Sequence, residues 1–208
     1  ANILTSGTSS LAAAFGQSGG DGDDSLTASG DAAVNATAAS TGSSLSLTLT
    51  GANIGDMSNT ATASAIGLDG GSGNDGLFAA GSVAASATAT ANASSIGIGF
   101  TGATIADISN SGLASATALA GGDGNDSIIS DKRATATARS SSDIDTVTVQ
   151  LTGAGTATLG SSTLASAIGI DGGAGDDIIR ARDNRATANA SLTGDSYGIT
   201  AVGAAGQE

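Results

Sequence analysis

Four short segments combine glycine with carboxylates, the residue types best suited to hold a hard metal cation. They begin at Gly19, Gly70, Gly121 and Gly172, and all four match the pattern G-G-x-G-[DN]-D-x-[LI]. Glycine lets the backbone turn sharply and aim carbonyl oxygens inward, and an aspartate at a constant offset adds an anionic oxygen. Calcium binds six to eight such oxygens, whereas magnesium is less suited to a carbonyl-rich loop. The segments therefore predict calcium sites.

These segments resemble the nonapeptide G-G-x-G-x-D-x-U-x of the RTX, or haemolysin-type, calcium-binding proteins. The motif is complete in all four segments, and most of the chain lies outside it. The resemblance implies a parallel β-roll in which calcium lies between successive turns. It also implies that flanking glycine carbonyls and four carboxylates are the ligands: Asp24, Asp75, Asp126 and Asp177. In the family the nonapeptides follow one another in tandem, whereas here they are solitary, so the partner turn must come from elsewhere.

Each segment keeps one additional carboxylate by one of two routes. The first and third segments have Asp21 and Asp123 as third residue, and the second and fourth have Asp69 and Asp171 just before the glycines. The alternative interpretation is that all four are ordinary Gly-Asp turns without a metal. The complete predicted ligand set is Gly19, Gly20, Asp21, Gly22, Asp23, Asp24, Asp69, Gly70, Gly71, Gly73, Asn74, Asp75, Gly121, Gly122, Asp123, Gly124, Asn125, Asp126, Asp171, Gly172, Gly173, Gly175, Asp176 and Asp177.

The acidic segments belong to a 51-residue internal repeat. Their first glycines are separated by 51 residues in each of the three intervals between Gly19 and Gly172. We expect a single solenoid over residues 1–208 with about four repeats: 1–18 (partial), 19–69, 70–120, 121–171 and 172–208 (partial). Neither end carries an atypical capping repeat of the kind that solenoids normally need. We therefore expect either a longer array or stacking on another copy.

Within each repeat, apolar and polar residues alternate, which predicts β-strands with one buried face. Residues 45–49 read Leu-Ser-Leu-Thr-Leu, and residues 87–91 read Ala-Thr-Ala-Thr-Ala. A helical interpretation of the alanine-rich stretches is disfavoured by their Thr and Gly content. The pattern predicts an all-β, parallel β-solenoid (β-roll-like).

A shorter echo between residues 65–68 and 95–98 indicates about two coils per 51-residue repeat. Eight coils at about 4.8 Å would form a rod about 40 Å long. Three coils per repeat are the alternative, although the turns do not fall at thirds. Two inward apolar columns are expected, one of Leu45, Ile96 and Val147 and the other of Leu26, Leu77, Ile128 and Ile179.

Composition excludes several classes of protein. The 208 residues include no Cys, His, Pro or Trp and carry a net charge of -13. Without Cys and His the chain lacks a thiolate metal site and the commonest general base, and we expect no enzymatic activity. The acidic charge argues against nucleic-acid binding, and no apolar run is long enough to span a membrane. Large apolar residues are few, so bound calcium is expected to help the chain fold.

Other surface features allow more than one interpretation. All six basic residues follow residue 131, where they either meet the acidic front of a neighbouring chain or are solvated. Threonine alternation could indicate an ice-binding face, but Ala, Asn and Ser interrupt the threonine columns.

We expect a structural, extracellular calcium-binding β-solenoid that is secreted to the cell surface and self-associates head to tail. It would be a subunit or segment of a cell-surface filament, surface layer or matrix, with a cell-surface glycan as a further candidate ligand. The alternatives are a calcium-stiffened spacer or binding region of a large secreted adhesin, and a calcium-folding secretion module of an RTX exoenzyme or toxin.

Overall fold

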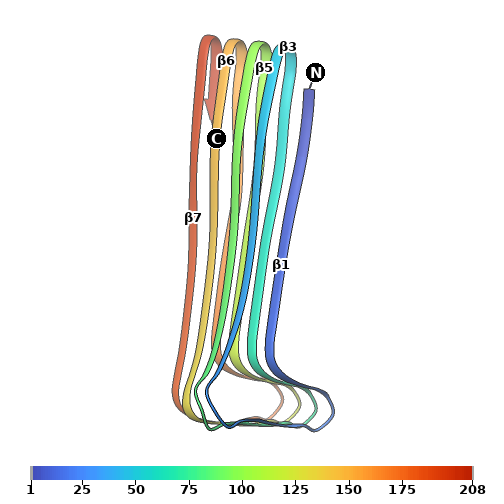
Figure 1. The fold of residues 1–208 in the computed structure, drawn as a ribbon, viewed down its shortest axis with the longest axis vertical. Coiled ribbons are helices and arrows are strands. Elements are labelled where there is room, and N and C mark those ends of the chain that lie inside the picture. Colours follow the sequence, from blue (N-terminus) through green and yellow to red (C-terminus); the bar gives the residue numbers. More distant parts are fainter. Residues whose placement is uncertain (1, 208) are drawn as a thin grey trace.

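The computed structural model describes residues 2–207 as long parallel β-strands wound into a solenoid (Figure 1). The predicted all-β, parallel solenoid is confirmed. No helix occurs among the described residues, and hence none that could cross a membrane. The strands are β1 (Asn2–Asp21), β2 (Ser25–Ala28), β3 (Ala32–Ser72), β4 (Gly76–Ala79), β5 (Val83–Asp123), β6 (Ser127–Ala174) and β7 (Ile178–Gln207).

Each coil of the solenoid takes one full repeat. Leu45 pairs with Ile96, and Ile96 pairs with Val147, so neighbouring strands are offset by 51 residues. Between β6 and β7 the offset becomes 50 after a register shift between Ser130 and Arg133. The prediction of about two coils per repeat is therefore wrong. Ala65 pairs with Ala116 and Ser95 with Ser44, so the two similar segments that suggested a second coil never pair with each other.

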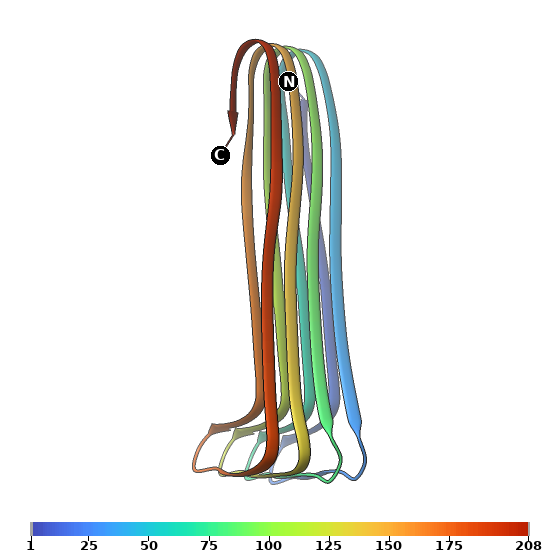
Figure 2. The same ribbon diagram turned by 90° about the vertical axis from the view of Figure 1, so that its left-hand side faces the viewer.

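The strands β3, β5 and β6 each run up one sheet, reverse, and run down the other (Figures 1 and 2). We call the reversal the tip and the opposite end, where short strands β2 and β4 lie, the base. Four ascending strands (32–50, 83–101, 134–152 and 184–202) form one sheet, and four descending strands (2–21, 52–72, 103–123 and 154–174) form the other. Four coils are about 19 Å thick and a 20-residue strand is about 66 Å long. The molecule is a flat slab, not the predicted rod.

Its accessible surface reflects this flatness. The chain exposes 9638 Å², whereas a compact protein of its mass exposes about 8,400 Å². More of each strand therefore faces solvent, or a partner, than in a compact domain.

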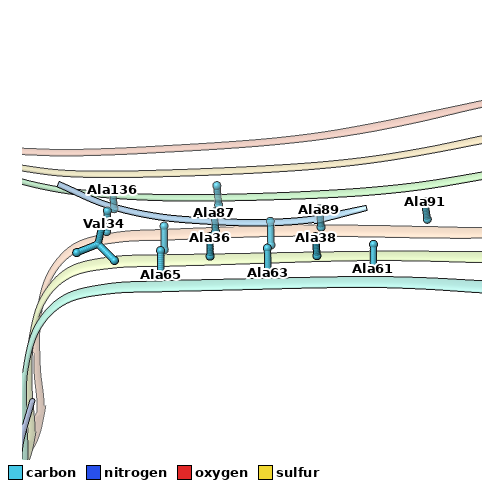
Figure 3. Packing of buried hydrophobic residues seen from close by; sticks show 14 residues of the cluster. Val34, Ala36, Ala38, Ala61, Ala63, Ala65, Ala87, Ala89, Ala91 and Ala136 are labelled. Carbon is cyan, nitrogen blue, oxygen red and sulfur yellow. The ribbon is translucent and has the colours of Figure 1, made fainter. Parts of the chain in front are cut away.

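The interior changes in composition from base to tip. At the base, three sides enclose large apolar residues such as Leu68, Leu77 and Ile128. Further up, alanines of the two sheets face each other, including Ala38 and Ala63 (Figure 3). These small side chains let the two sheets pack closely in this part of the slab.

The two predicted inward columns have different outcomes. Leu26, Leu77 and Ile128 are buried at the base as predicted, whereas Ile179 lies on edge strand β7 and is 46% exposed. The column of Leu45, Ile96 and Val147 is wrong, because Leu45 is 68% and Ile96 44% exposed and Val147 is half-buried.

Strand parity explains this error. Side chains alternate between the two faces of a strand, so residues separated by an odd number of positions point opposite ways. Ala36 is buried and lies nine positions before Leu45 on the same uninterrupted ascending strand. The alanines occupy the interior, and the leucines near the tip therefore face outward.

The tip turn depends on glycine. Gly51, Gly102 and Gly153 occupy equivalent positions of successive coils and all have positive φ, 126° at Gly102. A Cβ on Gly102 would also collide with the carbonyl oxygen of Gly51 in the adjacent coil. Both the backbone conformation and the coil spacing therefore exclude a side chain here.

We expect Gly102→Ala to lower the free energy of unfolding by more than about 2 kcal/mol, since it combines a disfavoured φ with a backbone collision. The matched control is Gly160→Ala, at an exposed strand position where a Cβ would lie 3.7 Å from the Ile108 carbonyl oxygen. It should change stability by less than about 0.5 kcal/mol. Urea unfolding followed by circular dichroism measures both, and equal effects would contradict this account of the tip.

Candidate metal centre

The four acidic segments lie side by side in successive coils, in register, at the base of the slab (Figure 2). Gly20 pairs with Gly71, Gly71 with Gly122, and Gly122 with Gly173. We call residues 19–26, 70–77, 121–128 and 172–179 the loop stack. The partner turn of each solitary nonapeptide is thus the same loop of the adjacent coil.

One column of carboxylates in the loop stack accepts hydrogen bonds from the preceding coil. The Asp24 N–H donates to Asp75 Oδ1 at 2.8 Å, and the Asp75 N–H donates to Asp126 Oδ1 at 2.8 Å. The Asp126 N–H donates in the same way to Asp177 Oδ1 at 2.9 Å. These four aspartates, predicted as metal ligands, join consecutive coils through one of their two oxygens.

The residues just before them form a second column that runs the other way. The Asn74 N–H donates to Asp23 Oδ1 at 2.7 Å, and the Asn125 N–H donates to Asn74 Oδ1 at 2.9 Å. The Asp176 N–H donates to Asn125 Oδ1 at 2.8 Å. Because only one acceptor oxygen is used, Asp and Asn serve equally, which explains why the motif contains either residue at this position. Sequence reasoning missed this role, although the recurrence of Asp or Asn at a 51-residue spacing was its signal.

The second oxygen of the first column has no hydrogen-bond partner. Oδ2 of Asp24, Asp75 and Asp126 is buried and unpartnered, and Asp75 and Asp126 are each only 2% exposed. This oxygen faces the first glycine of its own loop: a Cβ on Gly70 would lie 2.6 Å from Asp75 Oδ2. A buried carboxylate oxygen without a partner is costly unless a cation or a proton neutralises it. The loop stack therefore contains a column of oxygens suited to a cation.

The other predicted ligands contribute less. Asp21, Asp123 and Asp171 are exposed. Asp69 is partly buried, and burial together with the nearby charge of Asp75 raises the pKa of its carboxyl group. Among residues 2–207, no three or more acidic side chains converge on one point.

Several backbone groups of the predicted metal-ligand residues form hydrogen bonds between neighbouring coils. The N–H groups of Gly22, Gly73 and Gly124 donate to the carbonyls of Ser72, Asp123 and Ala174 in the following coil. The last glycines of the set, Gly173 and Gly175, have positive φ and lie in the final loop. The residues thus fit calcium in donor chemistry, with one buried, unpartnered carboxylate oxygen in each of the first three loops, and the remaining ligands would have to be backbone carbonyls and water.

The two columns should differ in their contribution to stability. Asp126→Ala removes the acceptor of the Asp75 N–H in a buried place, and should lower the free energy of unfolding by about 1–3 kcal/mol. Asn125→Ala removes the acceptor of the Asp176 N–H at an exposed place, where water can replace it, and should cost less than about 1 kcal/mol. Chemical denaturation in chelator measures both. A cost for Asn125→Ala as large as that for Asp126→Ala would contradict the burial argument.

Comparison of the chain with protein-family models, with curated proteins and with solved structures finds no match.

Proposed function

We propose that this chain is a structural, calcium-binding β-solenoid of the cell exterior, whose coils stack head to tail in a filament, surface layer or matrix. The observation that carries the proposal is the reciprocity of the two hydrogen-bond columns in the loop stack. One column accepts from the preceding coil and the other from the following coil, so a further coil of the same kind satisfies both at once.

The two faces of the described stack are complementary at this point. The first coil presents the Asp23 N–H as a donor and the Asp24 carboxylate as an acceptor, and the last coil presents the Asp176 carboxylate and the Asp177 N–H. In-register stacking would pair Asp176 with Asp23 and Asp177 with Asp24. The added coil can belong to a second copy or to a longer chain.

Charge contributes little to this arrangement. All six basic residues follow residue 131, whereas the first coil is acidic. In-register stacking would place Asp31 of the first coil in the column that runs through Ser82 and Arg133 to Asp183. Asp183 already pairs with Arg133 and lies 3.7 Å from Arg185 Nε, so a stacked Asp31 would meet a carboxylate as well as an arginine. Exposed ion pairs contribute at most about 1 kcal/mol each, so the proposal rests on the hydrogen-bond columns.

Calcium is proposed from the column of buried Oδ2 atoms and from the RTX-like motif. A divalent cation at the loop stack would supply positive charge that offsets the repulsion between stacked carboxylates in a chain of net charge -13. Extracellular calcium modules work at roughly 10⁻⁴–10⁻³ M, and we propose an affinity in this range for the loop stack.

Calorimetric titration tests the proposed calcium site. We expect the native chain to bind calcium at millimolar concentration, and Asp75→Asn/Asp126→Asn to weaken that binding at least tenfold, because it removes two buried anionic oxygens. The matched control is Asp56→Asn/Asp107→Asn, an exposed pair stacked one coil apart outside the loops. It makes the same change in net charge and should bind as the native chain does. No uptake by the native chain, or equal loss in both variants, would contradict a loop-stack site.

Head-to-tail stacking is tested by negative-stain electron microscopy in millimolar calcium and again in chelator. We expect long uniform fibres in calcium that dissolve in chelator. Isolated slabs in calcium would contradict stacking between copies. They would instead favour the second candidate function, a spacer of a larger secreted adhesin or a secretion module of an exoenzyme, in which further coils of one chain continue the stack.

A further inference from the structure

The outer face of the ascending sheet carries a continuous apolar surface next to the tip. In-register pairing aligns the three apolar positions of each coil, so that they form rows across the stack. We call this surface the apolar grid. It consists of Leu45, Leu47, Leu49, Ile96, Ile98, Phe100, Val147, Val149, Leu151, Tyr197 and Ile199.

The interior behind the apolar grid is polar. Thr104 donates a hydrogen bond to Gln150 Oε1 at 2.6 Å, and Gln150 Nε2 donates to the Thr152 carbonyl at 2.8 Å. Thr48 and Thr146 also point inward, and their hydroxyls have no partner. In this segment the usual distribution is reversed, with polar side chains buried and large apolar side chains outside. That distribution is unfavourable in water and becomes favourable when another apolar surface covers the outer face.

The extent of the grid matches a stable interface. Its eight most exposed side chains keep between 43% and 70% of their surface. At about 150–200 Å² for a fully exposed large side chain, they present on the order of 800 Å², which is what each partner buries in a standard protein–protein interface. Monomeric proteins rarely expose apolar patches of this size.

We propose that the apolar grid is a lateral interface, in which two copies of this chain pack grid against grid. A second copy suits this surface because the grid belongs to a β-sheet with a regular apolar pattern, and two such faces pack against each other as the layers of a sandwich do. An anionic lipid surface suits it poorly, because Asp143, Asp145 and Asp195 border the grid on the same face. The six basic residues lie towards the base. Arg139, for example, lies eight positions before Val147 on strand β6.

Lateral pairing is independent of head-to-tail stacking and of calcium. The loop stack lies at the base, at the other end of the strands from the grid (Figure 1). Pairing through the grid ends at a closed dimer, whereas stacking of coils grows without limit. In stacked copies the grids would join into one apolar stripe along the fibre, and lateral pairing would double the fibre.

Sedimentation velocity over a range of concentrations tests the proposal with a grid variant, Leu47→Thr/Ile98→Thr/Val149→Thr. Threonine keeps the strand preference of these positions and removes their apolar surface. Each apolar side chain that is lost should raise the dissociation constant of the lateral dimer roughly tenfold, so the triple variant should raise it at least about 100-fold. The matched control is Leu11→Thr/Leu113→Thr/Leu164→Thr on the outer face of the descending sheet. These leucines share a column with Thr62, so the chain itself already places threonine there.

The native chain also contains its own reporter, which is useful if the grid variant fails to fold. Tyr197 is the only tyrosine, the chain has no tryptophan, and Tyr197 lies on the grid with 60% of its surface exposed. Acrylamide quenching of its fluorescence should fall at least twofold as the native dimer forms. The proposal is overturned if the native chain shows no closed dimer at about 100 μM, if Tyr197 quenching does not change with dimerisation, or if the control loses the dimer as readily as the grid variant. Loss of fibres in chelator with the dimer retained would separate this interface from head-to-tail stacking.

Discussion

In-register pairing of coils 51 residues apart is the constraint on which the whole molecule depends. It places each side chain about 4.8 Å from its counterpart in the next coil, so every position must tolerate a neighbour of its own kind. Apolar columns satisfy this condition simply, as Leu77 and Ile128 do at the base. Carboxylate columns do not, because like charges repel. The loop stack reduces this cost by directing one oxygen of Asp75 or Asp126 to a backbone N–H of the adjacent coil.

The same constraint makes a thin interior possible. Alanine contributes little apolar area, and the slab compensates with long uninterrupted ladders of backbone hydrogen bonds between coils. Fit between the two sheets comes from pairing small with larger residues. A Cβ on Gly42 would lie 2.8 Å from Met57 Sδ, and one on Gly112 would lie 2.5 Å from Ser140 Oγ. Interior glycines therefore mark places where the facing sheet already fills the space.

Much of the fold follows from the repeat, and the errors have definite causes. The constant spacing of the acidic segments predicted their stacking, and the apolar positions Leu26, Leu77 and Ile128 predicted the core at the base. The number of coils was wrong because local similarity between two segments does not reveal whether they pair. The hydrogen-bond columns were missed because the carboxylate of Asp126 bonds to a coil that is 51 residues away in the chain.

The repeat length and the strand class can be read from the amino-acid sequence, because both depend on periodicity along one chain. The number of residues in a coil, and hence the column of each residue, and the face of each strand that points inward are set by packing in three dimensions. The choice of the inward face involves a competition between two stripes of opposite parity, one containing Ala36 and the other Leu45. The alanine stripe occupies the interior, where the two sheets pack closely, and the uninterrupted strand then places the large side chains near the tip outside.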